Sequence, residues 1–121
     1  MAERSRELKK KPGGEAEVLA RIAAMSAADR LMAARIHAIV KSHAPHLVPR
    51  TWYGMPAYAK DGEVICFFQS ADKFKTRYST FGFSDKAKLD QGSAWPVAFA
   101  LRELNAETEA LLGALIQRAA A

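Results

Sequence analysis

The sequence contains few of the residues on which many kinds of site depend. It has one cysteine, Cys66, so an internal disulfide is excluded, and a lone thiol suits a reducing compartment. No stretch is continuously apolar over the ~18 residues that a membrane span needs, and the first residues lack the apolar centre of a signal peptide. We therefore expect a cytoplasmic protein that makes no contact with a membrane.

Recognisable catalytic and metal-binding motifs are also missing. There is no Gly-rich phosphate loop, no Ser/His/Asp arrangement and no pair of spaced metal motifs. Cys66 lies in the apolar run 64–68, where a buried thiol is inert. The imidazoles are His37, His43 and His46, and the position of His43 near a helix C-terminus is explained by the helix dipole. These absences predict no enzyme, no catalytic residue, no metal site and no resident cofactor.

Positive charge is the one excess in the composition, and it is uneven. The formal net charge is +5, and residues 1–13 hold five basic residues against two acidic ones. This segment ends in Pro12-Gly13-Gly14 and has little to bury, which predicts a disordered basic tail over residues 1–14 and a single domain over residues 15–121. Scattered basic residues without aromatics are a weak signal for nucleic acid, so we keep nucleic-acid binding only as a minor alternative.

Apolar periodicity predicts three helices around a central region of strands. A first helix starts at Glu15, and a second starts at Ser26, whose hydroxyl and the acid Asp29 suit a helix N-terminus. Pro45 ends the second helix at about residue 44. Asn105 is a suitable cap for a C-terminal helix. The apolar faces expected of these helices are Val18, Leu19, Ile22 and Met25 in the first, Leu31, Met32, Ile36, Ile39 and Val40 in the second, and Leu111, Leu112, Leu115 and Ile116 in the last.

Residues 52–100 contain the strand signals. An aromatic stretch over 52–58 and the apolar run 64–68 flank Asp61-Gly62, a pair suited to the positive φ angles of a tight hairpin turn. Residues 46–50 are expected to connect the second helix to the sheet, and residues 84–90 to form a short helical turn. Further strands are predicted over 75–81 and over 94–100, where Pro96 favours an edge position or a bulge.

This order predicts an α+β fold: an antiparallel sheet of about four strands packed against N-terminal and C-terminal helices. Simple alternation along 64–68 places Val64, Cys66 and Phe68 on one face and Ile65 and Phe67 on the other. Both sets are apolar, so both faces should be covered. The C-terminal helix, a dimer partner and a ligand pocket all remain open as the cover of the second face.

The stretch Trp52-Tyr53-Gly54-Met55-Pro56-Ala57-Tyr58, the Asp-Gly hairpin and Trp95-Pro96 before a closing helix resemble the YdhG-like family, a bacterial domain of unknown function. The resemblance covers most of the chain from about residue 15. Some members are described as frataxin-like iron chaperones, which implies iron as a ligand. Hard cations need clustered oxygen donors, whereas the leading helices hold only Glu15, Glu17 and Asp29, with three arginines nearby.

The aromatic hairpin is the predicted ligand site. Gly54 and Pro56 interrupt the strand ladder, which predicts either a simple turn at the sheet edge or a bulge with a pocket beside it. The cations Lys75 and Arg77 suit an anionic ligand, although cations on a strand also protect an edge from unwanted pairing. The predicted function is a non-catalytic binding module for a small molecule or a protein, with a homodimer left open; the alternatives are an iron chaperone and a weak nucleic-acid-binding protein. The proposed ligand-binding residues are Trp52, Tyr53, Met55, Tyr58, Arg77 and Trp95.

Overall fold

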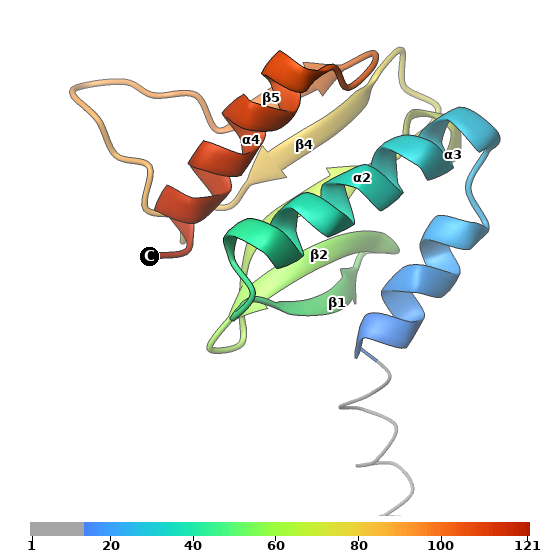
Figure 1. Ribbon diagram of the computed structural model, residues 1–121, viewed down its shortest axis with the longest axis horizontal. Coiled ribbons are helices and arrows are strands. Elements are labelled where there is room, and N and C mark those ends of the chain that lie inside the picture. The colour runs from blue at the N-terminus through green and yellow to red at the C-terminus, as the bar shows by residue number, and fades with distance from the viewer. Residues whose placement is uncertain (1–13) are drawn as a thin grey trace, which may run out of the picture.

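Five antiparallel strands form one sheet in chain order in the computed structural model, which describes residues 14–121 (Figure 1). The strands are β1 (Val48–Trp52), β2 (Met55–Lys60), β3 (Glu63–Gln69), β4 (Ser79–Phe83) and β5 (Ala98–Leu101). The strand order is the same as the sequence order, so β1 and β5 are the two edges of the sheet. The expected α+β class is confirmed, with five strands rather than about four.

The longer helices lie on one face of this sheet (Figure 1). They are an N-terminal helix, described over residues 14–23, α2 (Ala27–His43) and α4 (Ala106–Ala119), while the short α3 (Ala71–Phe74) joins β3 to β4. Within the described part of the chain, no helix has the length and apolar character needed to cross a membrane. The predicted basic tail falls outside the described residues except for Gly14, which is helical.

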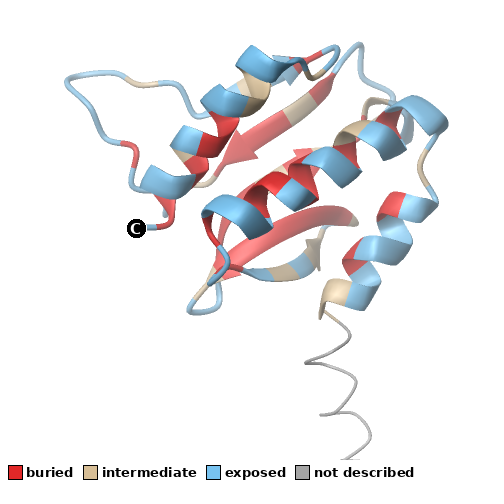
Figure 2. Ribbon diagram, in the orientation of Figure 1, coloured by how far each residue is buried: buried red, intermediate tan, exposed pale blue. Residues whose placement is uncertain are grey.

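The hydrophobic core fills the layer between the helices and the sheet (Figure 2). Ile36 and Val40 of α2 and Leu112 and Ile116 of α4 are almost completely buried, and Phe68 lies opposite them in the sheet. Only part of each predicted apolar face is used: Val18 and Ile22 of the N-terminal helix are buried, whereas Leu19, Leu31 and Leu111 are exposed. Apolar spacing identifies which side of a helix faces the core, but it does not tell how wide a strip of that side the neighbouring elements cover.

The helix boundaries follow the sequence signals, although the capping differs. The second helix ends at His43, before Pro45 as predicted, and the Asn105 side chain accepts a hydrogen bond from the Thr108 amide at 2.8 Å, which confirms the cap of α4. Ser26 precedes α2 but makes no side-chain capping bond. The carboxylate of Asp29 is buried and accepts bonds from another segment, as described below.

The aromatic stretch contains a turn, one of the two alternatives predicted for it, as well as a strand. Residues 48–52 form β1, where the sequence suggested only a connection, and Tyr53 and Gly54 form the turn to β2 with φ angles of 52° and 77°. A residue with these angles pays a steric penalty unless it is glycine, so this turn depends on Gly54. The predicted turn at Asp61 and Gly62 is confirmed, with φ angles of 53° and 82°.

Pro56 and the predicted later strands also required correction. Pro56 is fully buried in β2, one strand in from the edge, and it pairs with Thr51. The third predicted strand, 75–81, begins only at Ser79, and the fourth, 94–100, begins at Ala98, beyond Pro96. Residues 84–90 form turns and bends rather than a helical turn. The edge position expected for the fourth predicted strand is confirmed, because β5 is an edge.

A β-bulge changes which side chains of β3 face the helices. Tyr58 pairs with Cys66 and Ala59 pairs with Val64, so Ile65 has no partner and joins Cys66 in the helix-side core. The prediction of simple alternation along this strand was therefore wrong. An extra residue at a bulge changes the face of the sheet toward which the preceding side chains point. Phe67 lies across the opposite face, with its ring so close to Gly82 that a Cβ there would lie 2.5 Å from it.

Of the three covers expected for the second face, the C-terminal helix is wrong, because α4 and the other long helices lie on the opposite side of the sheet (Figure 1). A dimer partner and a ligand pocket stay predictions. The rings of Trp52 and Phe67 lie 5.4 Å apart over the small residues Ala57 and Gly82, both of which are buried. Large rings lying over small residues remove much of this surface from water without a second layer.

Candidate functional site

Loops and strand ends gather at one end of the sheet, which we call the α3 end. Here β3 ends at Gln69, α3 follows, β4 begins at Ser79 and β5 ends at Leu101, because the register pairs Gln69 with Thr80 and Ser79 with Leu101. The N-terminal turn of α2 lies at the same end through Asp29. Side chains distant in the sequence therefore meet here.

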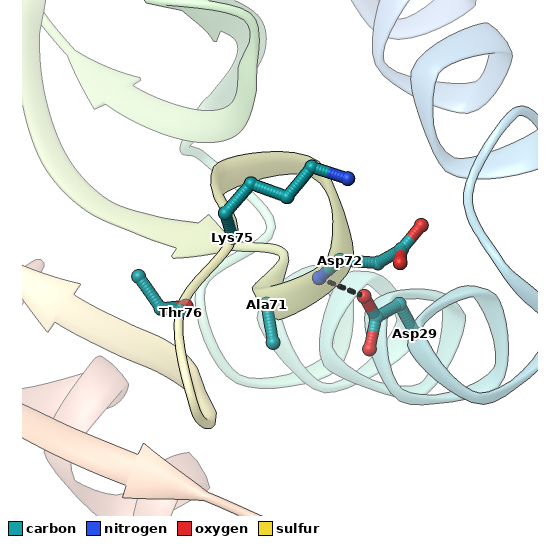
Figure 3. Close-up of a pocket in the computed structure, with 5 residues that line it drawn as sticks. All are labelled: Asp29, Ala71, Asp72, Lys75 and Thr76. Atoms are coloured by element: carbon teal, nitrogen blue, oxygen red, sulfur yellow. Dashed lines mark hydrogen bonds between the residues drawn. The ribbon is translucent and has the colours of Figure 1, made fainter.

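A buried carboxylate fixes the geometry of this end. Asp29 accepts hydrogen bonds from the Ser70 hydroxyl at 2.6 Å and from the Ser79 hydroxyl at 3.3 Å. It also accepts one from the Asp72 amide at 3.0 Å (Figure 3). The Ser70 and Ser79 side chains accept in turn from the amides of Lys73 and Ala71. The carboxylate therefore joins α2, α3 and the start of β4, and this is a positioning role that its helix-terminal location did not predict.

Two guanidinium groups and an aromatic ring line a cleft beside β5. Arg77, Tyr78, Ala100 and Arg102 surround a volume of about 360 Å³, which we call the Arg77–Arg102 cleft. A smaller cavity of about 270 Å³ shares three of these residues and reaches inward to Asp29. The Arg77 guanidinium lies 5.2 Å from the centre of the Tyr78 ring, a cation–π contact that helps to hold both groups in place.

The two arginines of the cleft have no negatively charged partner in the described part of the chain. Among residues 14–121, neither Arg77 nor Arg102 forms an ion pair, and both side chains are exposed. Each guanidinium presents a planar fork of donors that matches the two oxygens of a carboxylate or phosphate. Strand β5 and the loop before β4 place both forks beside one cleft, although the two residues are distant in the sequence.

The groove between α2 and α4, of about 480 Å³, differs from this cleft because its charges are paired. Arg35 donates two hydrogen bonds to Glu109, at 2.6 and 3.1 Å. The hydrogen bond from Arg35 lowers the pKa of Glu109, and the same contact raises the pKa of Arg35. The ring of His43 occupies the space beside Gly113, where a Cβ would lie 2.6 Å from Nε2. No cation is left there for an anionic ligand.

A third hollow, of about 390 Å³, surrounds α3 and has mixed charge. Figure 3 shows the Asp29 carboxylate beside the amide of Asp72, with Lys75 and Thr76 on the following turn. The carboxylates of this hollow oppose an anion, and three of the acceptor sites of Asp29 are already used by its donors. We therefore treat the hollow as part of the support for the neighbouring loop.

Tyr58, one of the predicted ligand-binding residues, is instead part of an internal hydrogen-bond chain. Its hydroxyl lies 2.9 Å from Nδ1 of His37, and Nε2 of His37 lies 2.9 Å from the carboxylate of Glu15, which also accepts from Lys41 at 2.7 Å. The hydrogen bond from Lys41 and, next, the one from His37 lower the pKa of Glu15, while burial raises the pKa of the Tyr58 phenol. Tyr58 is on the helix side and almost fully buried, so ligand contact there is corrected to a structural role.

The other predicted site residues are spread over several surfaces. Trp52 and Tyr53 lie at the β1–β2 turn with ring centres 5.0 Å apart, and Tyr53 is 78% exposed. Met55 is buried in β2, and Trp95 packs against the helix-side core from the loop before β5. Of the six predicted residues, Arg77 alone lines any of the four cavities described here, and it lines two of them.

Sequence reasoning missed two components of the observed arrangement. Arg102 received no weight because nothing local marks it, and only the β4–β5 register brings it close to Arg77. The contact between His37 and Glu15 was also missed. The spacing of His37 and Lys41, four residues apart on one helix, was an available sign that both side chains share one face.

The donors that iron would require do not gather in the described residues. Across residues 14–121, no three His, Cys, Asp or Glu side chains lie close enough together to hold a metal ion. Burial raises the pKa of the Cys66 thiol and keeps it protonated, which does not suit a metal ligand. The donor set of the described chain therefore does not fit the iron site implied by the family resemblance.

Comparison of the chain with protein-family models, with curated proteins and with solved structures finds no match, so the functional argument rests on the geometry of the site.

Proposed function

We propose that this domain is a non-catalytic binding module that recognises an anionic group, a carboxylate or a phosphate, in the Arg77–Arg102 cleft. The observation that carries the proposal is the placement of two unpaired guanidinium groups beside one cavity, one of them stacked on Tyr78. Forked donors bind planar or tetrahedral oxyanions with good geometry, and the ring adds an apolar wall. The proposal keeps the predicted class of function and moves the site from the hairpin to the cleft.

Hydrogen bonds hold the segment beside the cleft in place, and this favours a binding site over a surface that only contacts water. The segment that carries Arg77 follows α3, whose first turn is tied to α2 by Asp29. Lys73 of α3 also donates to the Gly54 carbonyl at 3.2 Å, which connects the segment to the β1–β2 turn. Pre-organised donors lose less conformational entropy when a ligand binds. Kinship with the YdhG-like family stays a prediction beside this proposal.

Titration of the isotope-labelled protein with inorganic phosphate and with succinate, followed by amide NMR, tests the proposal. The amides of Tyr78 and Ala100 should shift in a saturable way, and the double variant Arg77→Gln/Arg102→Gln should abolish the response. Arg21→Gln is the matched control, because Arg21 is exposed on the N-terminal helix away from the cleft. Unchanged spectra with both anions, or equal responses in the wild type and the double variant, would reject the proposal.

A further inference from the structure

Strand β5 ends the sheet with unpaired backbone groups. The amide of Phe83 donates to the carbonyl of Val97 at 2.7 Å, which makes this a hydrogen-bonded pair in the β4–β5 ladder. Bonded and non-bonded pairs alternate along antiparallel strands, so Phe99 and Leu101 also direct their N–H and C=O groups toward β4. It follows that Ala98 and Ala100 direct theirs outward, at the edge of the sheet.

No described element covers this edge. Ala98 and Ala100 are exposed, and no backbone hydrogen bond of either residue to a loop is found among residues 14–121. The strand Ala98–Leu101 has only four residues, but it contains no charged residue and no proline, two of the features by which natural edge strands resist pairing. Such an edge is a template for one more strand.

Two arginines lie beside the end of β5, and their positive charge defines the kind of partner that would fit. Ala100 lines the Arg77–Arg102 cleft, so the outward backbone groups and the two guanidinium groups border the same volume. A strand added beside β5 would carry alternate side chains on the face where Ala98 and Ala100 project. Carboxylates at those positions would reach the cleft, whereas lysine or arginine there would be repelled.

We propose that β5 receives an extended acidic peptide segment as a sixth strand, with at least one of its carboxylates in the Arg77–Arg102 cleft. This inference rests on the proposed function and names the ligand class of the same site. Backbone pairing with Ala98 and Ala100 supplies affinity, and the arginines select acidic side chains. A second copy of the chain fits less well, because residues 91–101 contain no Asp or Glu to pair with the guanidinium groups.

The test uses a short fluorescent peptide of alternating glutamate and threonine, together with the same peptide N-methylated at every second residue. The methylated peptide keeps its charge and loses strand pairing. We expect saturable binding of the first peptide by fluorescence anisotropy and binding about tenfold or more weaker for the second, since each lost backbone bond weakens affinity several-fold. Hydrogen exchange at Ala98 and Ala100 should slow in the complex with the first peptide only.

A protein variant provides a second, independent readout. Ala98→Pro removes an amide hydrogen that faces away from β4, at a residue that does not line the cleft, so it should weaken peptide binding several-fold and leave the phosphate response of the cleft in place. Ala94→Pro, in the loop before β5, is the matched control and should bind the peptide normally. Amide spectra of both variants show whether the sheet is intact, and the methylated peptide tests the same point without any change to the protein.

The outcomes separate this inference from the proposed function. Equal binding of both peptides, lost in Arg77→Gln/Arg102→Gln, would overturn strand pairing and retain the anion site. A response to phosphate and succinate without binding of either peptide would do the same. No response to any anion or peptide would overturn both. Self-association of the wild type that Ala98→Pro abolishes would assign the edge to a second copy and overturn the peptide.

Discussion

The two edge strands of the sheet differ in how far their backbone is protected from pairing with another strand. At β1, Pro49 offers no amide hydrogen, Arg50 is charged, and the N-terminal helix packs so closely that a Cβ on Gly14 would lie 2.6 Å from the Pro49 carbonyl oxygen. At β5, the outward backbone groups of Ala98 and Ala100 have no hydrogen-bond partner among residues 14–121, and they lie beside two arginines that form no ion pair there. The comparison indicates that the fold protects one edge and leaves the other available for a partner.

Each edge has its own anchor. The N-terminal helix beside β1 is held through Glu15, which contacts His37 and Lys41, and through Glu17, which accepts from Thr51 at 3.5 Å. The segment that completes the β5 side is held through Asp29. Removing one anchor at a time should therefore loosen one side of the molecule and leave the other side intact.

The largest expected effect is the loss of the anchor beside β5. Asp29→Ala removes the charged acceptor of three donors and should lower the free energy of unfolding by about 3 kcal/mol, because the two serine hydroxyls are left buried without it. Urea denaturation measures this change. Hydrogen exchange should become faster over residues 70–79 and stay unchanged over residues 14–23.

Asp72→Ala is the control for this variant, because its exposed side chain is not the group that bonds Asp29. We expect a change within about 0.5 kcal/mol. An equal loss of stability in both variants would show that charge at α3, rather than the buried carboxylate, holds this end.

On the opposite side, His37→Ala should lower the free energy of unfolding by about 2 kcal/mol, since the buried Tyr58 hydroxyl loses its partner and a small cavity forms. Exchange should become faster over residues 14–23 and not at β5. Lys41→Gln keeps the imidazole and removes only the exposed ammonium, so its effect should be about 0.5 kcal/mol. Faster exchange at β5 in His37→Ala would contradict the independence of the two sides.

A smaller effect is expected from Gly14→Ala, which tests the contact of the N-terminal helix with β1. Alanine favours a helix, but its Cβ would meet a backbone oxygen that cannot move away easily, so we expect a net loss of about 1 kcal/mol. Ala16→Gly, at an exposed position of the same helix, gives the effect of propensity alone. If propensity dominated, Gly14→Ala would stabilise the protein, and thermal unfolding distinguishes the two signs.

The smallest effect concerns the pH dependence of the same anchor. The folded-state pKa of Glu15 lies below its ordinary value of 4.5, so its contribution is present above that value and is lost as the pH falls through the lower folded pKa. The contribution should be below about 1 kcal/mol, because the carboxylate is partly exposed. The stability difference between the wild type and Glu15→Gln should shrink between about pH 7 and about pH 3. Glu63→Gln, at the exposed first residue of β3, is the control, because Glu63 forms no ion pair among residues 14–121.

Much of the fold was predictable because its signals are local. Pro45 ends a helix through its ring, Asp61-Gly62 adopts positive φ angles, and Asn105 caps α4 with its own side chain. The candidate site was less predictable. Tyr58 looked like a ligand-binding aromatic, and its burial follows only from the packing of α2 and the N-terminal helix over β2.

The sequence by itself determined the α+β class, the ends of α2 and α4 and one hairpin turn, because these depend on backbone preferences of neighbouring residues. Only the tertiary structure decided that Ile65 turns to the core at a bulge, that β1 is covered and that Arg102 lies close to Arg77. Those features come from contacts between segments distant in the chain. Such contacts depend on strand register and helix packing, which no local pattern encodes.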